Sequence, residues 1–178
     1  TLIFPYFQGL VFCTYLTNQG GWKSLNDAYT NPPISTEQIL HPEKYRGPFA
    51  DNPMKIDFMK INPPQGFKYI GTSVIGELTT RILLSQFGGK IAAEGWDGDS
   101  LIVFESTEPE KPMITSAWMT TWDSRTDAEE FAVACLRQWS QKPTTIQLAK
   151  EFFEINSNFQ SEDLFIEIRG QDVLVLRG

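Results

Sequence analysis

The chain has 178 residues and a formal net charge of −7, with 15 lysine and arginine residues against 22 aspartate and glutamate residues. Its basic residues form no cluster, which argues against nucleic acid and against an anionic membrane surface as partners. No apolar run approaches the roughly 18 to 20 residues that a membrane span needs. Hydrophobic residues make up 41% of the chain, a content typical of a folded protein with a core.

The N-terminal part of the chain predicts buried helices. Between residues 6 and 18, apolar side chains occur on every side of a helix, a pattern typical of a helix that is buried all round. Gly20 and Gly21 end this helix, because glycine is a poor helix former. A short second helix follows, with Trp22 on its apolar face.

A third short helix is predicted just before His41. Ser35 and Gln38 have the spacing of a capping box, in which the serine side chain bonds the backbone N–H three residues later. Pro42 ends this helix at His41, since a proline disfavours helical backbone in the residue before it. The N-terminal region is therefore expected to contain three helical segments.

A change in composition follows. Residues 46–71 are rich in proline and glycine, which predicts an extended connector. Apolar and polar residues alternate over residues 54–58, so one short strand is expected there. We place a domain boundary in this region, with a helical segment and its connector over residues 1–62 and a second domain over residues 63–178.

The second domain alternates helices with pairs of strands. In chain order, the expected elements are a helix over residues 73–87, one helical turn over residues 90–94, strands over residues 100–105 and 113–122, a helix capped by Asp123 or Ser124, a helical segment over residues 144–153, and strands over residues 164–169 and 173–177. The apolar stripe of the first helix is Ile75, Leu78, Ile82 and Leu83, and that of the helix after Ser124 is Ala128, Phe131, Cys135 and Trp139. The expected fold is α+β, with N-terminal buried helices followed by an antiparallel sheet of two hairpin-like strand pairs and helices on one face.

The sequence contains no complete catalytic motif that we can identify. His41 is its one histidine, and the two cysteines, Cys13 and Cys135, lie far apart in helix-like segments where buried apolar thiols are expected. One histidine and two distant cysteines do not supply the three or four ligands of a usual zinc site. Asp97 and Asp99 flank a glycine, where a turn is expected rather than a calcium site. We assign this chain no catalytic residue, no metal ligand and no cofactor.

Two sequence motifs carry a resemblance to a known class of proteins. Residues 5–45 contain PYxxGxxFxxxLxxxGGW and AYxxPPxSTEQILHPEKY. The structural residues of the first motif are Tyr6, Gly9, Gly20, Gly21 and Trp22. On these motifs the segment resembles bacterial, mostly exported proteins that look like zinc peptidases of the HExxH, gluzincin-like class. Similar fragments follow further on: GEL at residues 76–78, GWDGD at 95–99 and TTWDSRTDAEEFA at 120–132.

The resemblance implies that the chain is the C-terminal part of such a protein, with the HExxH segment upstream. It implies an exported or extracytoplasmic location and zinc in the longer parent protein. The helix of residues 6–18 would pack behind the zinc helix, and the second domain would be an accessory module. The side chains that would line the cleft are Glu37, His41, Glu43 and Tyr45. By itself the chain would be catalytically silent.

Two alternatives stay open. The first is a non-enzymatic interaction or structural module that binds a protein or peptide, since five tryptophans and a proline-rich connector are compatible with a partner surface. The second, which the sequence favours least, is a self-sufficient hydrolase that uses His41 with Glu37 or Glu43. In every case Gly9 is expected at a close contact between helices, where its lack of a side chain lets backbones approach.

Overall fold

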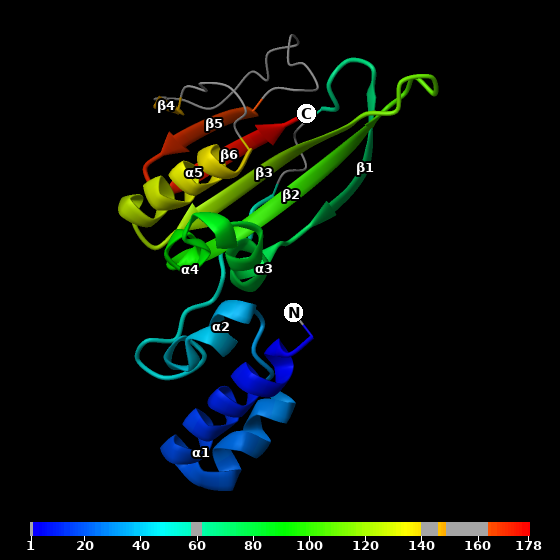
Figure 1. Cartoon of the computed structure of the whole chain (residues 1–178). Helices are drawn as coiled ribbons and strands as arrows, with labels where there is room; N and C mark the ends of the chain where they lie inside the picture. Colours follow the sequence, from blue (N-terminus) through cyan, green and yellow to red (C-terminus); the bar gives the residue numbers. More distant parts are fainter. Residues whose placement is uncertain (1, 58–61, 140–145, 149–163) are drawn as a thin grey trace. The chain divides into compact units, whose positions relative to one another are not determined.

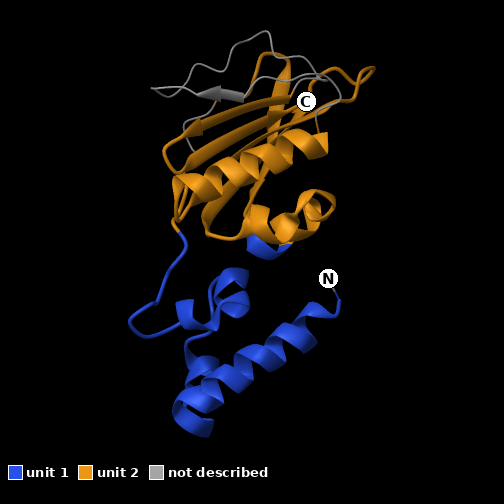
Figure 2. Cartoon of the chain, turned by 60° about the vertical axis from the view of Figure 1, so that its left-hand side comes forward, with its two compact units in different colours: residues 1–53, 76–78 blue, residues 54–75, 79–178 orange. Residues whose placement is uncertain are grey.

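The computed structural model describes residues 2–57, 62–139, 146–148 and 164–178 (Figure 1). Over these residues an N-terminal helix precedes an antiparallel sheet with helices, so the expected α+β class is confirmed. The chain forms two compact units, coloured separately in Figure 2. Unit 1 comprises Thr1–Pro53 and Gly76–Leu78, and unit 2 comprises Met54–Ile75 and Thr79–Gly178. Among the described residues, no helix combines the length and hydropathy of a membrane span.

Unit 1 begins with α1, Phe4–Thr30, which is interrupted at two glycines. The backbone leaves helical geometry at Gly20 and Gly21, and Gly21 has a φ of +63°. Residues with a Cβ rarely adopt this φ, so the glycine pair allows the break. The predicted pair of helical stretches, separated at Gly20 and Gly21, is confirmed.

Only one face of α1 is buried. Phe12 and Leu16 form a small core with Tyr45, and the rings of Phe12 and Tyr45 meet edge to face with their centroids 5.1 Å apart. Tyr6 and Trp22 are exposed. The prediction of a helix buried all round is therefore wrong for the described part of the chain, because the segment that follows α1 covers one face of it only.

The second helix of unit 1 is α2, Thr36–Leu40, and it begins at a capping box. The Ser35 hydroxyl accepts a hydrogen bond from the backbone N–H of Gln38 at 3.1 Å. The Gln38 side chain in turn accepts one from the backbone N–H of Ile34 at 2.9 Å. The 3₁₀ helix η1, Pro42–Lys44, follows directly. Both the predicted start of α2 and its end before the proline are confirmed.

Unit 2 is built on a six-stranded sheet with the order β1-β2-β3-β6-β5-β4 (Figure 1). The strands are β1 (Phe67–Ser73), β2 (Trp96–Ser106), β3 (Ile114–Trp122), β4 (Ile146–Leu148), β5 (Leu164–Arg169) and β6 (Asp172–Arg177). All neighbouring strands are antiparallel except β4, which runs parallel to β5. The predicted pairs β2–β3 and β5–β6 are confirmed, and β3 joins them by pairing with β6.

Short helices and one long helix complete this part of the chain. They are α3 (Gly76–Leu83), the 3₁₀ helix η2 (Ser85–Phe87), α4 (Gly89–Ala93) and α5 (Arg125–Trp139). Figure 1 shows α5 lying along one face of the sheet, and Phe131 of α5 packs against Trp118 and Trp122 of β3. The expected α5 stripe is confirmed, with Cys135 fully buried and Trp139 partly buried against the same core.

The other face of the sheet has its own apolar cluster. Leu174 and Leu176 of β6 alternate with residues that face α5, as the two-residue period of a strand requires. Together with Ile102 and Phe104 of β2 they form a second buried cluster, against which Ile56 packs. Unit 2 therefore has an apolar core on each side of the sheet.

Two predictions around the connector are corrected by the structure. Residues 67–73 form β1, whereas the sequence predicts a connector up to residue 71 and a helix from residue 73. β1 is an edge strand whose register shifts between Tyr69 and Gly71, and Gly71 weakens the alternating pattern. Conversely, residues 54–57 form no strand, and Phe58 of that prediction lies outside the described residues.

Two more predictions fail inside unit 2. Asp97 and Gly98 lie at a bulge in β2 and not in a turn, since the register of β2 and β3 shifts between Trp96 and Gly98. Residues 146–148, expected within a helix, form β4, and the rest of that helix prediction lies outside the described residues.

Candidate functional site

A buried acid at the start of α3 is the first unexpected feature of the site. The side chain of Glu77 is 0% exposed, and Thr80 of α3 is buried as well. Ile82 and Leu83, which the sequence places on the apolar face, are exposed instead. The predicted apolar stripe is therefore only partly confirmed, since Ile75 packs against the core of unit 2 while Ile82 and Leu83 lie at the surface.

Glu77 meets the one histidine of the chain. Its Oε1 lies 3.0 Å from Nε2 of His41, a hydrogen-bond distance. The other ring nitrogen, Nδ1, lies 3.9 Å from Oε1 of Glu43. The imidazole, whose side chain is 23% exposed, thus has a carboxylate beside each nitrogen. Such neighbours fix the orientation of the ring.

Glu37 does not belong to this pair. Its carboxylate is buried, and its Oε1 accepts a hydrogen bond from Nζ of Lys44 at 2.6 Å. The same ammonium group lies 3.2 Å from Oδ2 of Asp51. Lys44 therefore joins α2 to the segment that leaves η1. Of the two acids that the least favoured hypothesis pairs with His41, Glu43 has its Oε1 atom 3.9 Å from Nδ1 of the imidazole.

Tyr45 anchors the end of η1 against α1. Its hydroxyl donates a hydrogen bond to the backbone carbonyl of Asn31, and its ring packs on Phe12. The guanidinium of Arg46 lies over the outer side of the ring, 4.6 Å from its centroid. With the hydroxyl bonded and most of the ring covered, Tyr45 acts as a packing residue.

Further hydrogen bonds hold α2 in place. The Gln38 amide donates to the backbone carbonyl of Asp51 at 2.6 Å and to Oδ1 of Asn52 at 3.2 Å. The Thr36 hydroxyl accepts a bond from the backbone N–H of Leu78 at 3.3 Å. The segment between α2 and Asn52 is thus cross-linked by side chains, and it carries His41 and Glu43 at fixed positions.

All four cleft candidates lie in this segment, and the residue that the sequence analysis missed is Glu77. The signal that points to it is weak. Glu77 is the acid of the GEL fragment, but an acid in the first turn of a helix is usually a solvated one. His41 and Glu77 lie 36 positions apart in the sequence, so no local sequence pattern predicts their contact.

The structure also places the glycine and the cysteines of the sequence analysis. A Cβ on Gly9 would meet nothing within 4 Å, so the expected close contact is absent from the described residues. Cys13 is partly buried and Cys135 is buried, and both are free thiols. Burial raises the pKa of the Cys135 thiol well above its ordinary value, which makes this thiol unreactive.

Neither unit by itself gathers a zinc ligand set among its described residues. Zinc sites in proteins use three or four ligands. Within either unit, the described residues bring no three carboxylate, imidazole or thiol ligand atoms together around one point.

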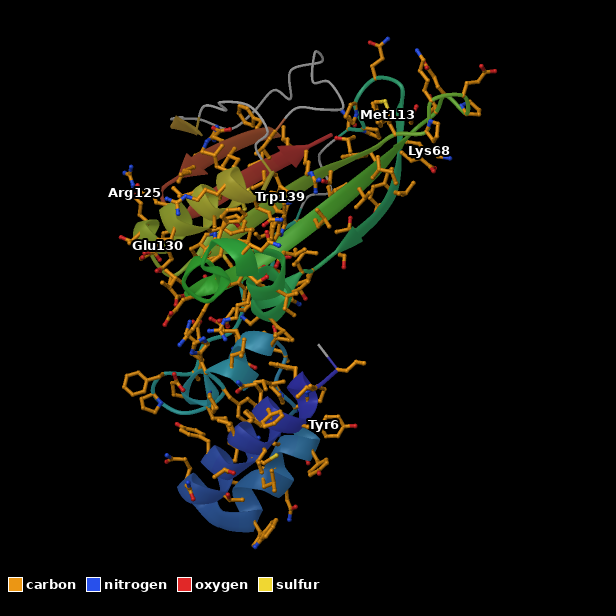
Figure 3. The ribbon with its side chains drawn as sticks, viewed as in Figure 1. Tyr6, Lys68, Met113, Arg125, Glu130 and Trp139 are labelled. Carbon is orange, nitrogen blue, oxygen red and sulfur yellow. The ribbon has the colours of Figure 1, made fainter. Side chains whose placement is uncertain are left out.

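A second candidate site is an apolar surface on α1. The side chains of Ile3, Tyr6, Phe7, Leu10 and Val11 are all exposed, and their spacing puts them on one side of the helix. We call this surface the α1 face. Figure 3 shows Tyr6 pointing away from the helix. No charged residue occurs between residues 1 and 22.

The comparisons with known proteins assign a family to the larger part of the chain. No curated protein and no solved structure matches it. A family model described as a domain of unknown function (DUF8575) matches residues 66–178, which is more than half of the chain and includes all six strands of the sheet. The chain therefore belongs to this family, the domain of unknown function DUF8575.

Proposed function

We propose that the chain is a non-catalytic module that binds another polypeptide segment through the α1 face. The observation that carries this proposal is the exposure of its five side chains, between 51% and 78% each. Their order along α1 is i, i+3, i+4, i+7 and i+8, the spacing with which a helix contacts a partner. Large contiguous apolar patches are uncommon on free monomers and mark interaction sites.

The free energy of burying apolar side chains favours a partner that covers the α1 face. Burying a large apolar side chain contributes roughly 1.5 to 3 kcal/mol before the costs of association are subtracted. Five such side chains therefore supply on the order of 10 kcal/mol of gross stabilisation, enough for a specific contact. The absence of charge between residues 1 and 22 means that no ionised group has to lose its water when the face is covered.

The occupant that we propose is the zinc-peptidase-like part of a longer protein. The first of the two motifs that carry that resemblance lies on α1, and its Tyr6 belongs to the α1 face. In this proposal the present chain is the C-terminal part of an exported zinc-peptidase-like protein, and zinc and the catalytic base belong to the upstream part.

His41 and Glu77 would then serve the cleft of that longer protein. The buried carboxylate of Glu77 holds the imidazole by its Nε2 atom, at 3.0 Å. Glu43 lies near the second nitrogen. Their role is to position polar groups, while the chain on its own is catalytically silent.

Site-specific photo-crosslinking tests the proposal. A photoreactive phenylalanine analogue replaces Phe7 in the endogenous polypeptide that contains this chain, and mass spectrometry identifies the crosslinked peptide. The matched control replaces Tyr29, which is also exposed on α1 but lies outside the α1 face. We expect a crosslink from position 7, and not from position 29, to a segment next to an HExxH motif. A crosslink to a protein without that motif would favour the interaction module, and no crosslink at all would overturn both readings.

A further inference from the structure

Unit 2 has an apolar groove on its helical side. The groove lies between η2, α4 and α5, is open to solvent and has a volume of about 590 Å³. Its apolar side chains include Phe87, Ile91 and Val133, which are 37%, 59% and 37% exposed. We call it the α5 groove.

Three charged side chains of α5 line this groove: Glu129, Glu130 and Arg137. Between Glu130 and Arg137 the exposed side chain is Val133. Neither Glu130 nor Arg137 has an ion pair or hydrogen bond in the part of the chain that the structure describes, whereas Glu129 accepts a hydrogen bond from Arg125 at 2.7 Å. Seven residues of helix separate the two charges by about 10 Å along the axis. Figure 3 labels Glu130 on the half of α5 that begins at Arg125.

We propose that the α5 groove binds a second copy of this chain, with the two α5 helices antiparallel across a twofold axis. The axis passes between Val133 and Ala134, which lie midway between the two charges in the sequence. Glu130 then faces Arg137 of the partner subunit, and Arg137 faces Glu130 of the partner subunit. This contact is isologous, because the same surface is used on both copies.

Charge complementarity favours this occupant over an unrelated partner. Each copy carries a formal net charge of −7, so a contact between two copies needs a surface that compensates this repulsion. The α5 groove provides such a surface, because Glu130 and Arg137 lie symmetrically about its apolar centre at Val133. A different protein would have to present a base and an acid at the same spacing, whereas a second copy presents them by symmetry.

A stable dimer interface buries roughly 800 Å² on each partner. About the proposed axis the two α5 helices overlap over residues 128–139 only, which gives a contact about 18 Å long. We therefore expect a weak, concentration-dependent dimer. The inference is independent of the proposed role of the α1 face, which lies on unit 1.

Sedimentation equilibrium of the full chain, from low micromolar to near-millimolar concentration, tests the dimer with two charge-reversal variants. Glu130→Arg and Arg137→Glu each place like charges opposite one another twice, and each should weaken the dimer by roughly tenfold or more. An equimolar mixture of the two variants should recover the wild-type affinity, because each contact in the mixed dimer again joins an acid to a base. That recovery also shows that both variants are folded.

Two controls separate this surface from others. Glu110→Arg makes the same charge change in the exposed loop between β2 and β3 and should leave the dimer unchanged. Phe7→Glu on the α1 face should leave it unchanged as well. A wild-type chain that is monomeric at every concentration would overturn the inference. So would a dimer that resists both charge reversals, or a mixture that associates no better than either variant alone.

Discussion

Glu77 and His41 form a hydrogen-bonded pair in which the acid is fully buried and the imidazole reaches the surface. The two residues come from different parts of the chain, and both belong to unit 1. Because α3 carries Glu77 at its first turn, the pair ties the start of α3 to the segment that contains α2 and η1.

Removing the buried acid should destabilise unit 1. Glu77→Ala deletes the acceptor of the His41 imidazole and leaves a small cavity, and we expect a loss of about 2 to 3 kcal/mol in the free energy of unfolding. Glu77→Gln keeps an acceptor of the same size and should cost about 1 kcal/mol. Urea denaturation of both variants measures the difference. Equal losses in the two variants would show that the hydrogen bond contributes little.

Gly9 should tolerate a side chain. Because a Cβ there meets nothing within 4 Å, Gly9→Ala should stabilise α1 by up to about 1 kcal/mol through its helix propensity. Thermal unfolding of the chain measures the difference. A large loss of stability in the isolated chain would mean that Gly9 is packed within it.

A side chain at Gly98, unlike one at Gly9, should destabilise the fold. A Cβ at Gly98 would overlap the backbone carbonyl of Met54, and backbone atoms cannot move aside cheaply. Gly98→Ala is therefore expected to cost about 2 to 3 kcal/mol. Gly71→Ala in β1 is the matched control, since a Cβ there meets nothing within 4 Å. Calorimetric unfolding of the two variants compares them, and similar melting temperatures would contradict the close approach of Met54 to β2.

Cys135 should be protected from thiol reagents at neutral pH while Cys13 reacts. Burial raises the pKa of the Cys135 thiol, so the native state holds the neutral form. This difference in pKa stabilises the native state below about pH 8.5, the pKa of the thiol in the unfolded chain. The stabilisation is lost as the pH rises toward the pKa of the thiol in the folded chain. Labelling with a chromogenic disulfide, followed by mass spectrometry, distinguishes the two thiols. Equal labelling rates under native conditions would contradict the burial of Cys135.

Unfolding at alkaline pH tests whether ionisation of the Cys135 thiol destabilises the native state. The free energy of unfolding of the wild-type chain should fall above about pH 8.5 more steeply than that of Cys135→Ala, which has no buried thiol to ionise. Parallel pH profiles for the two proteins would show that the thiol does not contribute.

The sequence predicts correctly those features that depend on residues close together in the chain. The Ser35 cap, the α5 stripe that contains Phe131, and the hairpin around Gly170 each depend on residues a few positions apart. The structure has all three. The strand β1 was missed because an edge strand with a bulge at Gly71 lacks a clean alternation.

Contacts between distant residues could not be predicted in this way. The apolar pattern of α1 indicates that its side chains suit burial, but it does not say what covers them, and in the described structure only the side with Phe12 and Leu16 is covered. The partner of His41 likewise depends on how α3 is turned. A buried Glu77 and an exposed Ile82 reverse the usual order of polarity, which tertiary contacts alone explain.

We propose that the α1 face contacts a zinc-peptidase-like part of the same protein. The first test is to purify the endogenous polypeptide that contains this chain and to determine its mass, its sequence upstream of Thr1 and its zinc content. We expect a longer polypeptide with an HExxH segment and one zinc ion for each chain. A polypeptide that contains no HExxH segment and no zinc would contradict this proposal.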